Sequence, residues 1–345
     1  MAVATLSDVA RRARVSEATA SRVLNRRRYV AAETRARVEL AVRELDYVPN
    51  RAARDLSMAR TATVALLVHH AQYPTHGEGT FSSRVVEGVS RALHEGGYDL
   101  LYVPIDDVSV EHVVGLATLR AGRSDGVLVL GPAFPNRAIL ALRDAGRPLV
   151  TIDNRLSGVD AVLADNRPAM MAITRHLTET HGYRRLACLA GPVHWPSTAE
   201  RVAGVHAAAA ERGATVRVLH AAETTIRDGA EMAGGLFEDP PDAVLAVNDA
   251  MAIGALHRLR SLPGARRPWV TGFDDIAWAP LTDPPLTTVA VNAAAMGGAA
   301  AGLLLGRIAE TPDDMLPARE IRVPTTVRLR RSCGCGEASR RRDHP

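Results

Sequence analysis

The stretch Thr5–Asn25, with the sequence TLSDVARRARVSEATASRVLN, decides how the first part of this 345-residue chain folds. Its pattern predicts two short helices, Leu6–Ala13 and Glu17–Leu24, joined by a tight turn. A third helix is expected over Ala32–Leu45. It ends there because Pro49 disfavours helical geometry in the residue before it. Two short helices followed by a third form a helix-turn-helix unit.

The second helix presents a polar face. Hydroxyl, amide and guanidinium groups suit contacts with DNA phosphates and base edges. This face carries Ser16, Glu17, Ala18, Thr19, Ser21, Arg22 and Asn25. Ser16 is also placed to cap the helix, and Thr5 with Asp8 forms a capping-box pattern one helix earlier. The alternative interpretation is a small helical subdomain with a solvated charged face.

Charge is distributed unevenly along the chain. Residues 1–60 contain thirteen arginines against seven acidic residues, whereas the net charge of the whole chain is +4. Residues 328–345 are also basic, so residues 61–327 are acidic overall. A basic head on an acidic body predicts a polyanionic partner held by one end of the protein.

From Thr63 onward, short apolar runs alternate with amphipathic helical stretches. Continuous apolar strands separated by helices predict parallel sheets covered by helices on both faces. The body is longer than one ordinary α/β domain, so two lobes are expected. The predicted strands are Val64–Val68, Leu100–Val103, Gly126–Leu130, Leu149–Ile152, Leu186–Ala190, Ala243–Val247 and Val270–Gly272.

Composition argues against a membrane or secreted protein. The longest uncharged apolar stretch, Ala293–Gly306, is shorter than the ~20 residues that cross a bilayer. Arginines appear early in the chain, where a signal peptide would have its apolar core. Three cysteines cannot form a disulfide framework. We therefore expect a cytoplasmic protein with no membrane partner.

A series of short motifs runs along nearly the whole chain. In the head they are Thr5–Ala10, Val15–Thr19 and Ser21–Asn25, followed by Tyr47–Asn50 and Ala53–Leu56. In the body they are Ser124–Val127, Pro148–Val150, Arg201–Gly204, Asn248–Asp249, Gly272–Asp275 and Pro285–Val289. Because these motifs occur in the same order as in the LacI/GalR family of bacterial transcription regulators, the chain resembles that family.

The resemblance implies a dimer whose second helix enters the major groove of each half-site of a palindromic operator. By that likeness Glu17, Ala18 and Arg22 face base edges, with Arg22 as a bidentate partner of guanine. Contacts with phosphate or sugar are implied for Thr5, Ser7, Ser16, Thr19, Ser21 and Asn25. Arg14 replaces the family's usual turn glycine, at a cost of about 1 kcal/mol if its φ is positive.

Residues 49–60 resemble the family's hinge. The resemblance implies that Asn50–Ala59 folds as a helix only when paired with its twin in the minor groove, where Leu56 wedges between base pairs. Asn50 and Ala53 are expected to contact DNA as well. Without the motif, Leu56 would be assigned to a hydrophobic core. A movement of the body that separates the two hinges would then lower operator affinity.

The body resembles the periplasmic sugar-binding-protein fold, in which two lobes joined by three crossovers enclose a ligand. Arg201, Asn248 and Asp274 match family positions that hold ligand hydroxyls, and their fork and acceptors suit vicinal diols. The complete set of effector candidates is Asp153, Ser197, Arg201, Asn248 and Asp274. Asp249 and Asp275 are either N-caps or ligand contacts.

Departures from the family pattern leave the effector class open. The segment His69–His76 replaces the usual loop after the first strand, and Val291 and Ala293 stand where polar or aromatic pocket residues often occur. Trp195 and Trp278 are placed either to stack on a ligand or to pack in the ordinary way. A sugar is what the resemblance implies.

Nothing in the sequence indicates a metal, a cofactor or catalysis. The chain has no phosphate loop, nucleophile elbow or zinc-protease motif. His69, His70 and His76 have no fixed carboxylate beside them. Cys333 and Cys335 form a single pair, which is more typical of a free tail than of a redox or metal site. We expect no metal and no cofactor.

The predicted architecture is an all-α helix-turn-helix head (1–48), a hinge (49–60), a two-lobed α/β body (61–330) and a flexible tail (331–345). The N-terminal lobe is expected to take about 61–158 and 291–323, and the C-terminal lobe about 159–290 and 324–330. The predicted function is a DNA-binding transcriptional repressor, not an enzyme, controlled by a small-molecule effector such as a sugar. A homodimer is expected, with a tetramer as the alternative. The rival functions are a solute-binding module and a sugar-processing enzyme with an attached helix-turn-helix domain.

Overall fold

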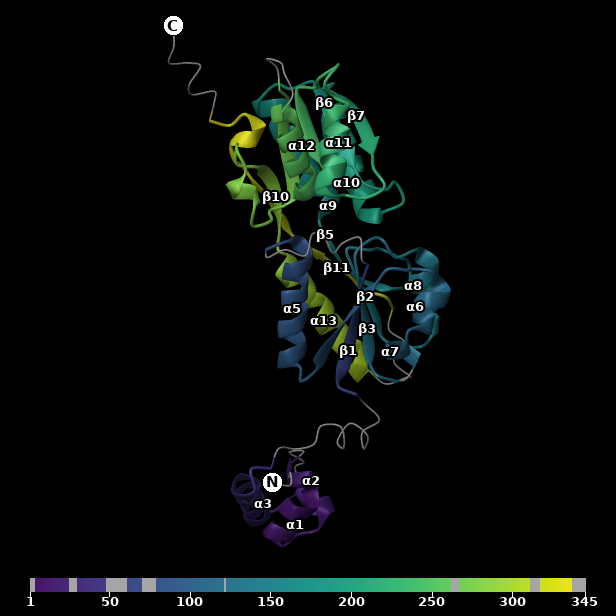
Figure 1. Ribbon diagram of the computed structural model, residues 1–345, viewed down its shortest axis with the longest axis vertical. Coiled ribbons are helices and arrows are strands. Elements are labelled where there is room, and N and C mark those ends of the chain that lie inside the picture. The colour runs from purple at the N-terminus through teal and green to yellow at the C-terminus, as the bar shows by residue number, and fades with distance from the viewer. Residues whose placement is uncertain are drawn as a thin grey trace. The chain divides into compact units, whose positions relative to one another are not determined.

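The computed structural model describes residues 4–24, 30–47, 61–69, 79–120, 122–261, 267–310 and 317–336. The chain divides into two units, Met1–Thr61 and Ala62–Pro345 (Figure 1). Within the described residues, no helix has the length and apolar character needed to span a bilayer.

Over residues 4–24 and 30–47, the first unit has three helices at the predicted places: α1 (Leu6–Ala13), α2 (Glu17–Leu24) and α3 (Ala32–Glu44). They enclose a small core of Val9, Ala10, Ala13, Ala20, Val23, Val38, Ala41 and Tyr47. Four of these residues are alanines, and their small side chains let the helices cross closely. The helix-turn-helix arrangement predicted from the sequence is confirmed.

The predicted caps of this unit are present. The Asp8 N–H donates to Thr5 Oγ1 at 3.3 Å, and the Thr5 N–H donates to Asp8 Oδ2 at 2.9 Å, which completes the capping box. The Thr19 N–H donates to Ser16 Oγ at 3.2 Å and so caps α2. Arg14 ends α1 in the left-handed region with φ 56°. This is the conformation that a glycine adopts without strain, and it costs a residue with a side chain about 1–2 kcal/mol.

The N-terminal lobe of the second unit is built on a six-stranded sheet with the order β11-β5-β4-β3-β1-β2, and all its pairs are parallel. Its strands are β1 (Thr63–His69), β2 (Asp99–Ile105), β3 (Gly126–Leu130), β4 (Leu149–Ile152), β5 (Asp160–Ala164) and β11 (Glu320–Val323). The helices are α5 (Phe81–Glu95), α6 (Val110–Gly115), α7 (Ala117–Arg120), α8 (Asn136–Asp144) and α13 (Ala293–Ala309).

Side chains that alternate along β1 separate the two cores of this lobe. Val64, Leu66 and Val68 belong to the core beneath α5 and α13, whereas Ala65 and Leu67 belong to the core beneath α6 and α8. The sheet is therefore covered on both faces, as the continuous apolar run predicted (Figure 1).

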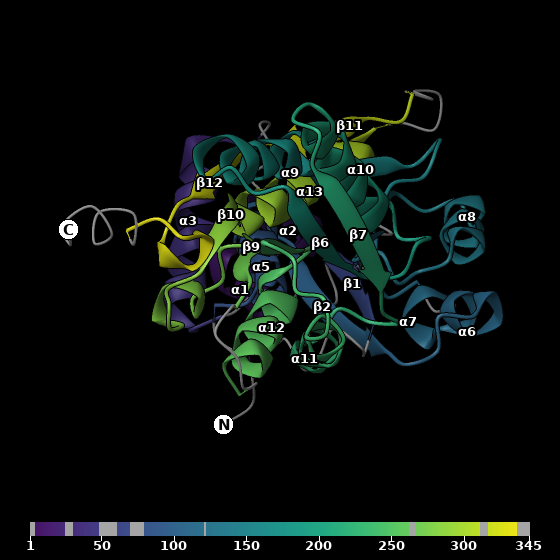
Figure 2. The same cartoon turned by 90° about the horizontal axis from the view of Figure 1, so that it is seen from above.

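The C-terminal lobe has a second six-stranded sheet with the order β12-β10-β9-β8-β6-β7. Its strands are β6 (Arg185–Ala190), β7 (Thr215–His220), β8 (Ala243–Ala246), β9 (Trp269–Asp274), β10 (Thr287–Val291) and β12 (Thr325–Arg328). The edge strand β12 runs antiparallel to β10, which differs from the expected all-parallel sheet. Helices α9 (Asn166–Arg175) and α10 (Pro196–Ala210) cover one face, and α11 (Ile226–Gly234) and α12 (Asp249–Ser261) cover the other (Figure 2). A π-helical turn at His176–Thr180 extends α9, and 3₁₀ turns lie at Ala279–Leu281 and Arg331–Cys333.

Within the part of the body that the structure describes, the chain passes between the lobes three times, each time through one residue. These residues are Asp165 between β5 and α9, Asn292 between β10 and α13, and Pro324 between β11 and β12. The first boundary corrects the prediction that the C-terminal lobe begins at 159. Because β5 pairs with β4 and β11, residues 160–164 belong to the N-terminal sheet.

The predicted flexible tail begins too early. Ser332 and Cys333 are buried in the C-terminal lobe. The Ser332 hydroxyl donates to the Val270 carbonyl at 2.6 Å and accepts from the Thr287 N–H at 2.7 Å, so it joins the neighbouring strands β9 and β10. These bonds hold Arg331–Cys333 against the sheet. Residues 337–345 lie outside the described part of the chain.

Candidate functional site

A cleft in the second unit is lined by residues of both lobes. Leu130 and Asp153, at the ends of β3 and β4, face it from the N-terminal lobe, and Asp274, at the end of β9, faces it from the C-terminal lobe. The first residues of α5, α10 and α11 also contribute. Carboxyl ends of parallel strands are where ligands bind in open α/β sheets. All five predicted effector residues line this cleft.

Arg201 is the most constrained polar side chain of the cleft. It projects from α10 and is buried, with its Nε donating to Asn166 Oδ1 at 2.8 Å and Nη1 donating to the Val247 carbonyl at 2.6 Å. Its guanidinium carbon lies 3.8 Å from the centroid of the Phe273 ring, within cation–π range. These contacts fix the fork, so Arg201 is preorganised to receive a ligand.

Two carboxylates lie near Arg201. Asp153 is buried, with Oδ1 3.9 Å from Arg201 Nη2, which is an ion-pair distance but too long for a hydrogen bond. Burial raises the pKa of Asp153 and of Asp274, and the attraction of Arg201 offsets the rise only in part. Asp153 Oδ1 has no hydrogen-bond partner among the described residues. A ligand hydroxyl would satisfy this oxygen.

Asn248 and Ser197 also line the cleft, and the contacts of Asn248 limit the hydrogen bonds that it can offer to a ligand. The Asn248 side chain accepts from the Met251 N–H at 2.8 Å, so it is the N-cap of α12, and it donates to the Thr224 carbonyl at 2.9 Å. Only one amide hydrogen of Asn248 is left for a ligand. Ser197 is buried in the first turn of α10.

Asp249 and Asp275 are not among the cleft residues, and neither is an N-cap. Asp249 accepts from Thr288 Oγ1 at 2.5 Å and from the Ile276 N–H at 2.9 Å, and so connects α12 with the strand ends of the sheet. Asp275 accepts from Arg330 Nη2 at 2.7 Å. Both alternatives left open by the sequence are therefore wrong for these two residues.

Among the described residues, three aromatic rings line the cleft, two of them from the tryptophans that the sequence offered as ligand contacts or packing residues. Phe81, Trp195 and Trp278 all face it, and Trp278 is 44% exposed. Phe81 was missed because its position depends on the helix that follows β1, although the rule that ligands bind at carboxyl ends of strands points there. Glu223 was also missed, and burial raises the pKa of its carboxyl group.

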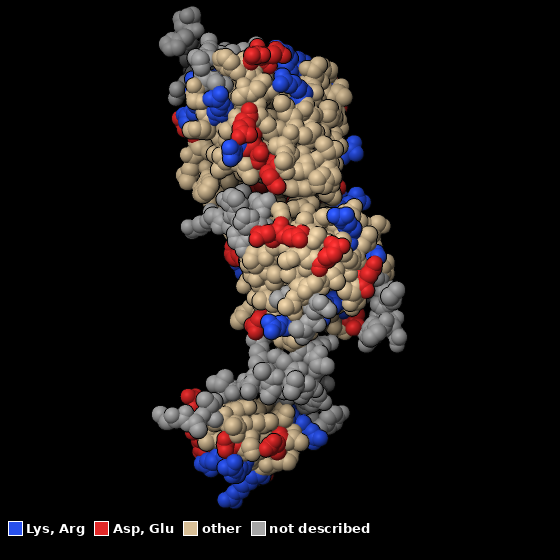
Figure 3. Space-filling model, turned by 45° about the vertical axis from the view of Figure 1, so that its right-hand side comes forward, with Lys and Arg blue, Asp and Glu red and all other residues tan. Residues whose placement is uncertain are grey.

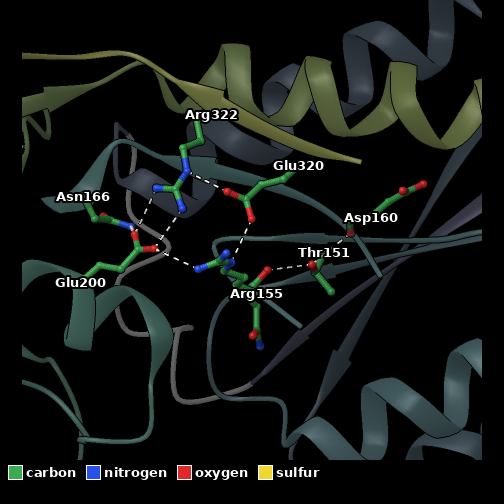
Figure 4. A network of polar contacts seen from close by, with 8 residues as sticks. Thr151, Arg155, Asp160, Asn166, Glu200, Glu320 and Arg322 are labelled. Atoms are coloured by element: carbon green, nitrogen blue, oxygen red, sulfur yellow. Dashed lines mark hydrogen bonds and ion pairs between the residues drawn. The ribbon is translucent and has the colours of Figure 1, made fainter. Parts of the chain in front are cut away.

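A polar network extends from the cleft to the crossovers between the lobes (Figure 4). Asn166, which accepts from Arg201, donates to Glu200 Oε2 at 3.3 Å, and Arg322 of β11 donates to Glu200 Oε1 at 3.0 Å. Burial alone would raise the pKa of Glu200, but the bonds from Arg322 and Asn166 outweigh it, and the pKa is lowered. Glu320 joins Arg322 to Arg155. The network links α10 of one lobe to β11 of the other.

The first unit exposes most of the predicted DNA contacts. Thr5, Ser7, Ser16, Glu17, Ala18 and Arg22 are exposed, and Thr19 and Ser21 are partly buried. The hydroxyls of Ser16 and Thr19 lie 2.9 Å apart and pair locally. Figure 3 shows arginine side chains gathered on one side of this unit. Asn25, Asn50, Ala53, Leu56, His70 and His76 lie outside the described residues.

Comparisons with known proteins agree with this arrangement. Residues 5–50 match the model of bacterial regulatory proteins of the lacI family, and residues 174–333 match the periplasmic binding protein-like domain. The ribose operon repressor of Bacillus subtilis (strain 168) is 31% identical over 331 residues, covering 94% of this chain and 97% of that protein.

Solved structures extend the likeness over both units. A complex of the transcriptional regulator CelR with cellobiose has 32% identity and a TM-score of 0.70, covering 95% of this chain and 99% of that one. A lac repressor dimer bound to operator and an anti-inducer has 24% identity and a TM-score of 0.81, covering 96% and 99%, and shows the shared fold. This chain therefore belongs to the LacI family of bacterial transcriptional regulators.

Proposed function

We propose that this regulator is a homodimeric repressor that binds a palindromic operator through α2. A neutral polyhydroxylated effector bound in the cleft changes its affinity for the operator. The cleft carries the proposal, because it surrounds one fixed guanidinium with acceptors from both lobes. Ribose and cellobiose appear in the names of similar proteins and agree with this class of ligand.

The charge balance of the cleft favours an uncharged ligand. Among the described lining residues, Arg201 is the one basic side chain, and Asp153, Asp274 and Glu223 are acidic. A phosphate or carboxylate on the effector would meet these three acids at close range, which disfavours its binding. Hydroxyl groups can donate to the carboxylates and accept from Arg201, so they match the cleft better.

The rings of the cleft support the same class. Sugars present apolar C–H faces, and Phe81, Trp195 and Trp278 offer apolar surfaces beside polar groups. A ligand held by a few convergent polar groups among apolar walls is the usual design of a small-molecule site. We therefore assign the cleft to binding rather than to turnover.

The test is a calorimetric titration of the full chain with neutral sugars, sugar phosphates and nucleobases, with the recovered ligand checked for chemical change. Binding of an unaltered neutral sugar is expected, and exclusive binding of a phosphorylated sugar or a nucleobase would reject the effector class. Asp274→Asn should weaken binding at least tenfold, equivalent to about 1.4 kcal/mol.

The neighbouring aspartate provides the matched control. Asp275 pairs with Arg330 and does not line the cleft, so Asp275→Asn should leave the dissociation constant of the effector unchanged. Equal losses in the two variants would show that Asp274 acts through stability and not through the ligand. The oligomeric state is tested separately, by analytical ultracentrifugation with and without an operator selected from random duplexes.

A further inference from the structure

Two histidines and two cysteines meet in the C-terminal lobe, in a cluster separate from the cleft. His176 is the first residue of the π-helical turn that extends α9, His181 follows its last residue, and Cys333 and Cys335 belong to the segment that follows β12. One ligand atom of each residue lies within 4.8 Å of those of the other three. Cys333 is buried, and the other three side chains are partly buried.

Four of the six separations within this cluster are those of a tetrahedron around a metal ion, and the other two are no longer than 4.8 Å. Zn–N bonds of about 2.0 Å and Zn–S bonds of about 2.3 Å require edges of about 3.3 Å between nitrogens and about 3.5 Å between nitrogen and sulfur. The two Nε2 atoms are 3.2 Å apart. His176 Nε2 lies 3.5 Å from Cys333 Sγ and 3.4 Å from Cys335 Sγ, and His181 Nε2 lies 3.5 Å from Cys335 Sγ.

The backbone brings each pair of ligands together in an unusual way. Residues five apart lie on different faces of an α-helix, but a π-helical turn widens the coil, so His176 and His181 meet. Gly334 stands between the cysteines with φ 97°, and a Cβ there would lie 2.6 Å from the Tyr183 hydroxyl. Any larger residue would therefore be strained at this position. Both departures from regular geometry direct ligand atoms at the same point.

Tyr183 and Thr287 contact the ligands of the cluster from outside. The Tyr183 ring stacks on His181 with centroids 5.1 Å apart, and its hydroxyl donates to the Cys333 carbonyl at 3.2 Å. The Thr287 hydroxyl lies 3.1 Å from Cys333 Sγ and is placed to donate to it. Outer contacts of this kind orient metal ligands and stabilise a thiolate.

We propose that His176, His181, Cys333 and Cys335 bind one zinc ion. Two thiolates balance the charge of the ion, and four protein ligands complete its tetrahedron, so the site is structural and closed. The ion ties the segment after β12 to the turn after α9. It thereby fastens the segment that follows the third crossover and β12 to the C-terminal lobe.

The first experiment measures metal in the full chain. Protein purified without chelator should contain roughly one zinc per chain by mass spectrometry of the elements, and Cys333→Ser/Cys335→Ser should retain less than a tenth of it. Cys188→Ala and His206→Ala are the matched controls, because Cys188 is buried in β6, His206 is exposed on α10, and both should keep the ion. Equal zinc in the double variant would overturn the proposal.

The second experiment keeps the test informative if the double variant folds poorly. Metal-free chain should take up one equivalent of Co²⁺ with the visible and near-ultraviolet absorption of a tetrahedral thiolate site, and Zn²⁺ should abolish that absorption. His181→Cys should still bind and shift the spectrum, whereas His181→Ala should lower the affinity at least tenfold. Absence of these bands, or a Cys333–Cys335 disulfide in the freshly purified protein, would overturn the proposal.

Discussion

The carboxyl group of Asp249 lies wholly inside the C-terminal lobe, between the start of α12 and the strand ends of the sheet. Burial raises its pKa to about 7, although the bonds from Thr288 and Ile276 favour the ionised form. The folded protein therefore holds a proton on Asp249 at pH values where the unfolded chain has lost it. Such a group stabilises the fold most below its unfolded pKa, and the contribution is lost as the pH rises through about 7.

Asp249→Asn should remove this pH dependence. In the parent protein, ionising Asp249 costs on the order of 3–4 kcal/mol of stability between pH 4 and pH 7, whereas an asparagine has no proton to lose. The slope of the free energy of unfolding against pH, measured by urea denaturation, should therefore be less negative in the variant over this window. Parallel curves for the two proteins would contradict the assignment.

Arg22 is exposed on α2, where a planar fork can reach a base edge. Arg22→Ala should relax the preference for one base pair by about 1–3 kcal/mol, while non-specific binding persists and still weakens with salt. Arg22→Lys keeps the charge but loses the bidentate geometry, so it should recover non-specific affinity and not selectivity. Binding to a panel of single-base operator variants gives the measurement, and undiminished selectivity of Arg22→Ala would refute the role.

Single residues differ in how far the sequence could predict them. Capping by Thr5 and Ser16 depends on neighbours within three residues, and it was predicted correctly. The positive φ of Arg14 was predicted only as a condition, because a backbone angle depends on the packing of both helices. Asn248 and Asp249 are adjacent, and their roles are set by contacts with Thr224, Thr288 and Ile276, which are distant in the sequence. Local pattern carries no information on such contacts.

At the scale of elements, the helix pair α5 and α13 shows how small residues set a distance. A Cβ on Gly88 would lie 1.9 Å from the Ala294 carbonyl oxygen, and one on Gly297 would lie 2.1 Å from the Val85 carbonyl oxygen. The two helices therefore pack with their backbones in contact at these points. No side chain fits at either position unless the helices move apart.

Gly297→Ala should lower the stability of the body by about 1–3 kcal/mol, the usual cost of overpacking. Gly302→Ala, in the same helix, is the control, because a Cβ there meets nothing within 4 Å. Alanine at Gly302 should raise stability by about 0.5–1 kcal/mol through its better helix propensity. Chemical denaturation measures the free energy of unfolding of both variants. If it changed with the same sign in the two, the close contact at Gly297 would not be what excludes a side chain there.

The elements themselves follow from the sequence better than their pairing does. Apolar runs and caps placed the three helices of the head and β1, β2, β3, β4, β6, β8 and β9 close to their observed bounds. No strand was predicted at β5, β7, β10, β11 or β12, so the pairing of β5 in the N-terminal sheet was missed as well. The edge strands β7, β11 and β12 alternate polar and apolar side chains, and the prediction relied on continuous apolar runs. It also did not show that β12 runs antiparallel, since direction depends on how the chain enters the sheet. The tail was misassigned because the burial of Cys333 depends on partners far away in the chain.

For the molecule as a whole, the network around Glu200 offers a route between the cleft and the crossovers. Arg201 donates to Asn166, Asn166 donates to Glu200, and Glu200 pairs with Arg322 of the other lobe. Any change in the angle between the lobes alters these pairs. The two lobes were predicted from the pattern and length of the body, and the cleft from the family resemblance. The network was not predicted, because its members come from four separate segments.

Effector and operator binding should be linked by one factor. If the effector changes operator affinity five- to 150-fold, operator DNA must change effector affinity by the same factor. Glu200→Gln, which does not alter a residue lining the cleft, should reduce this factor while effector affinity in the absence of DNA changes little. Titrations of effector with and without operator measure both quantities, and an unchanged factor in the variant would exclude the network from the coupling.

The three crossovers have a mechanical consequence. Each is a single residue, and at Pro324 the ring also fixes one of the two backbone torsions. Links this short do not allow the lobes to slide past one another or to separate. The remaining motion is a rotation of one lobe relative to the other through a limited angle. Whatever the occupied cleft communicates to the rest of the protein is therefore carried as an angle and not as a displacement.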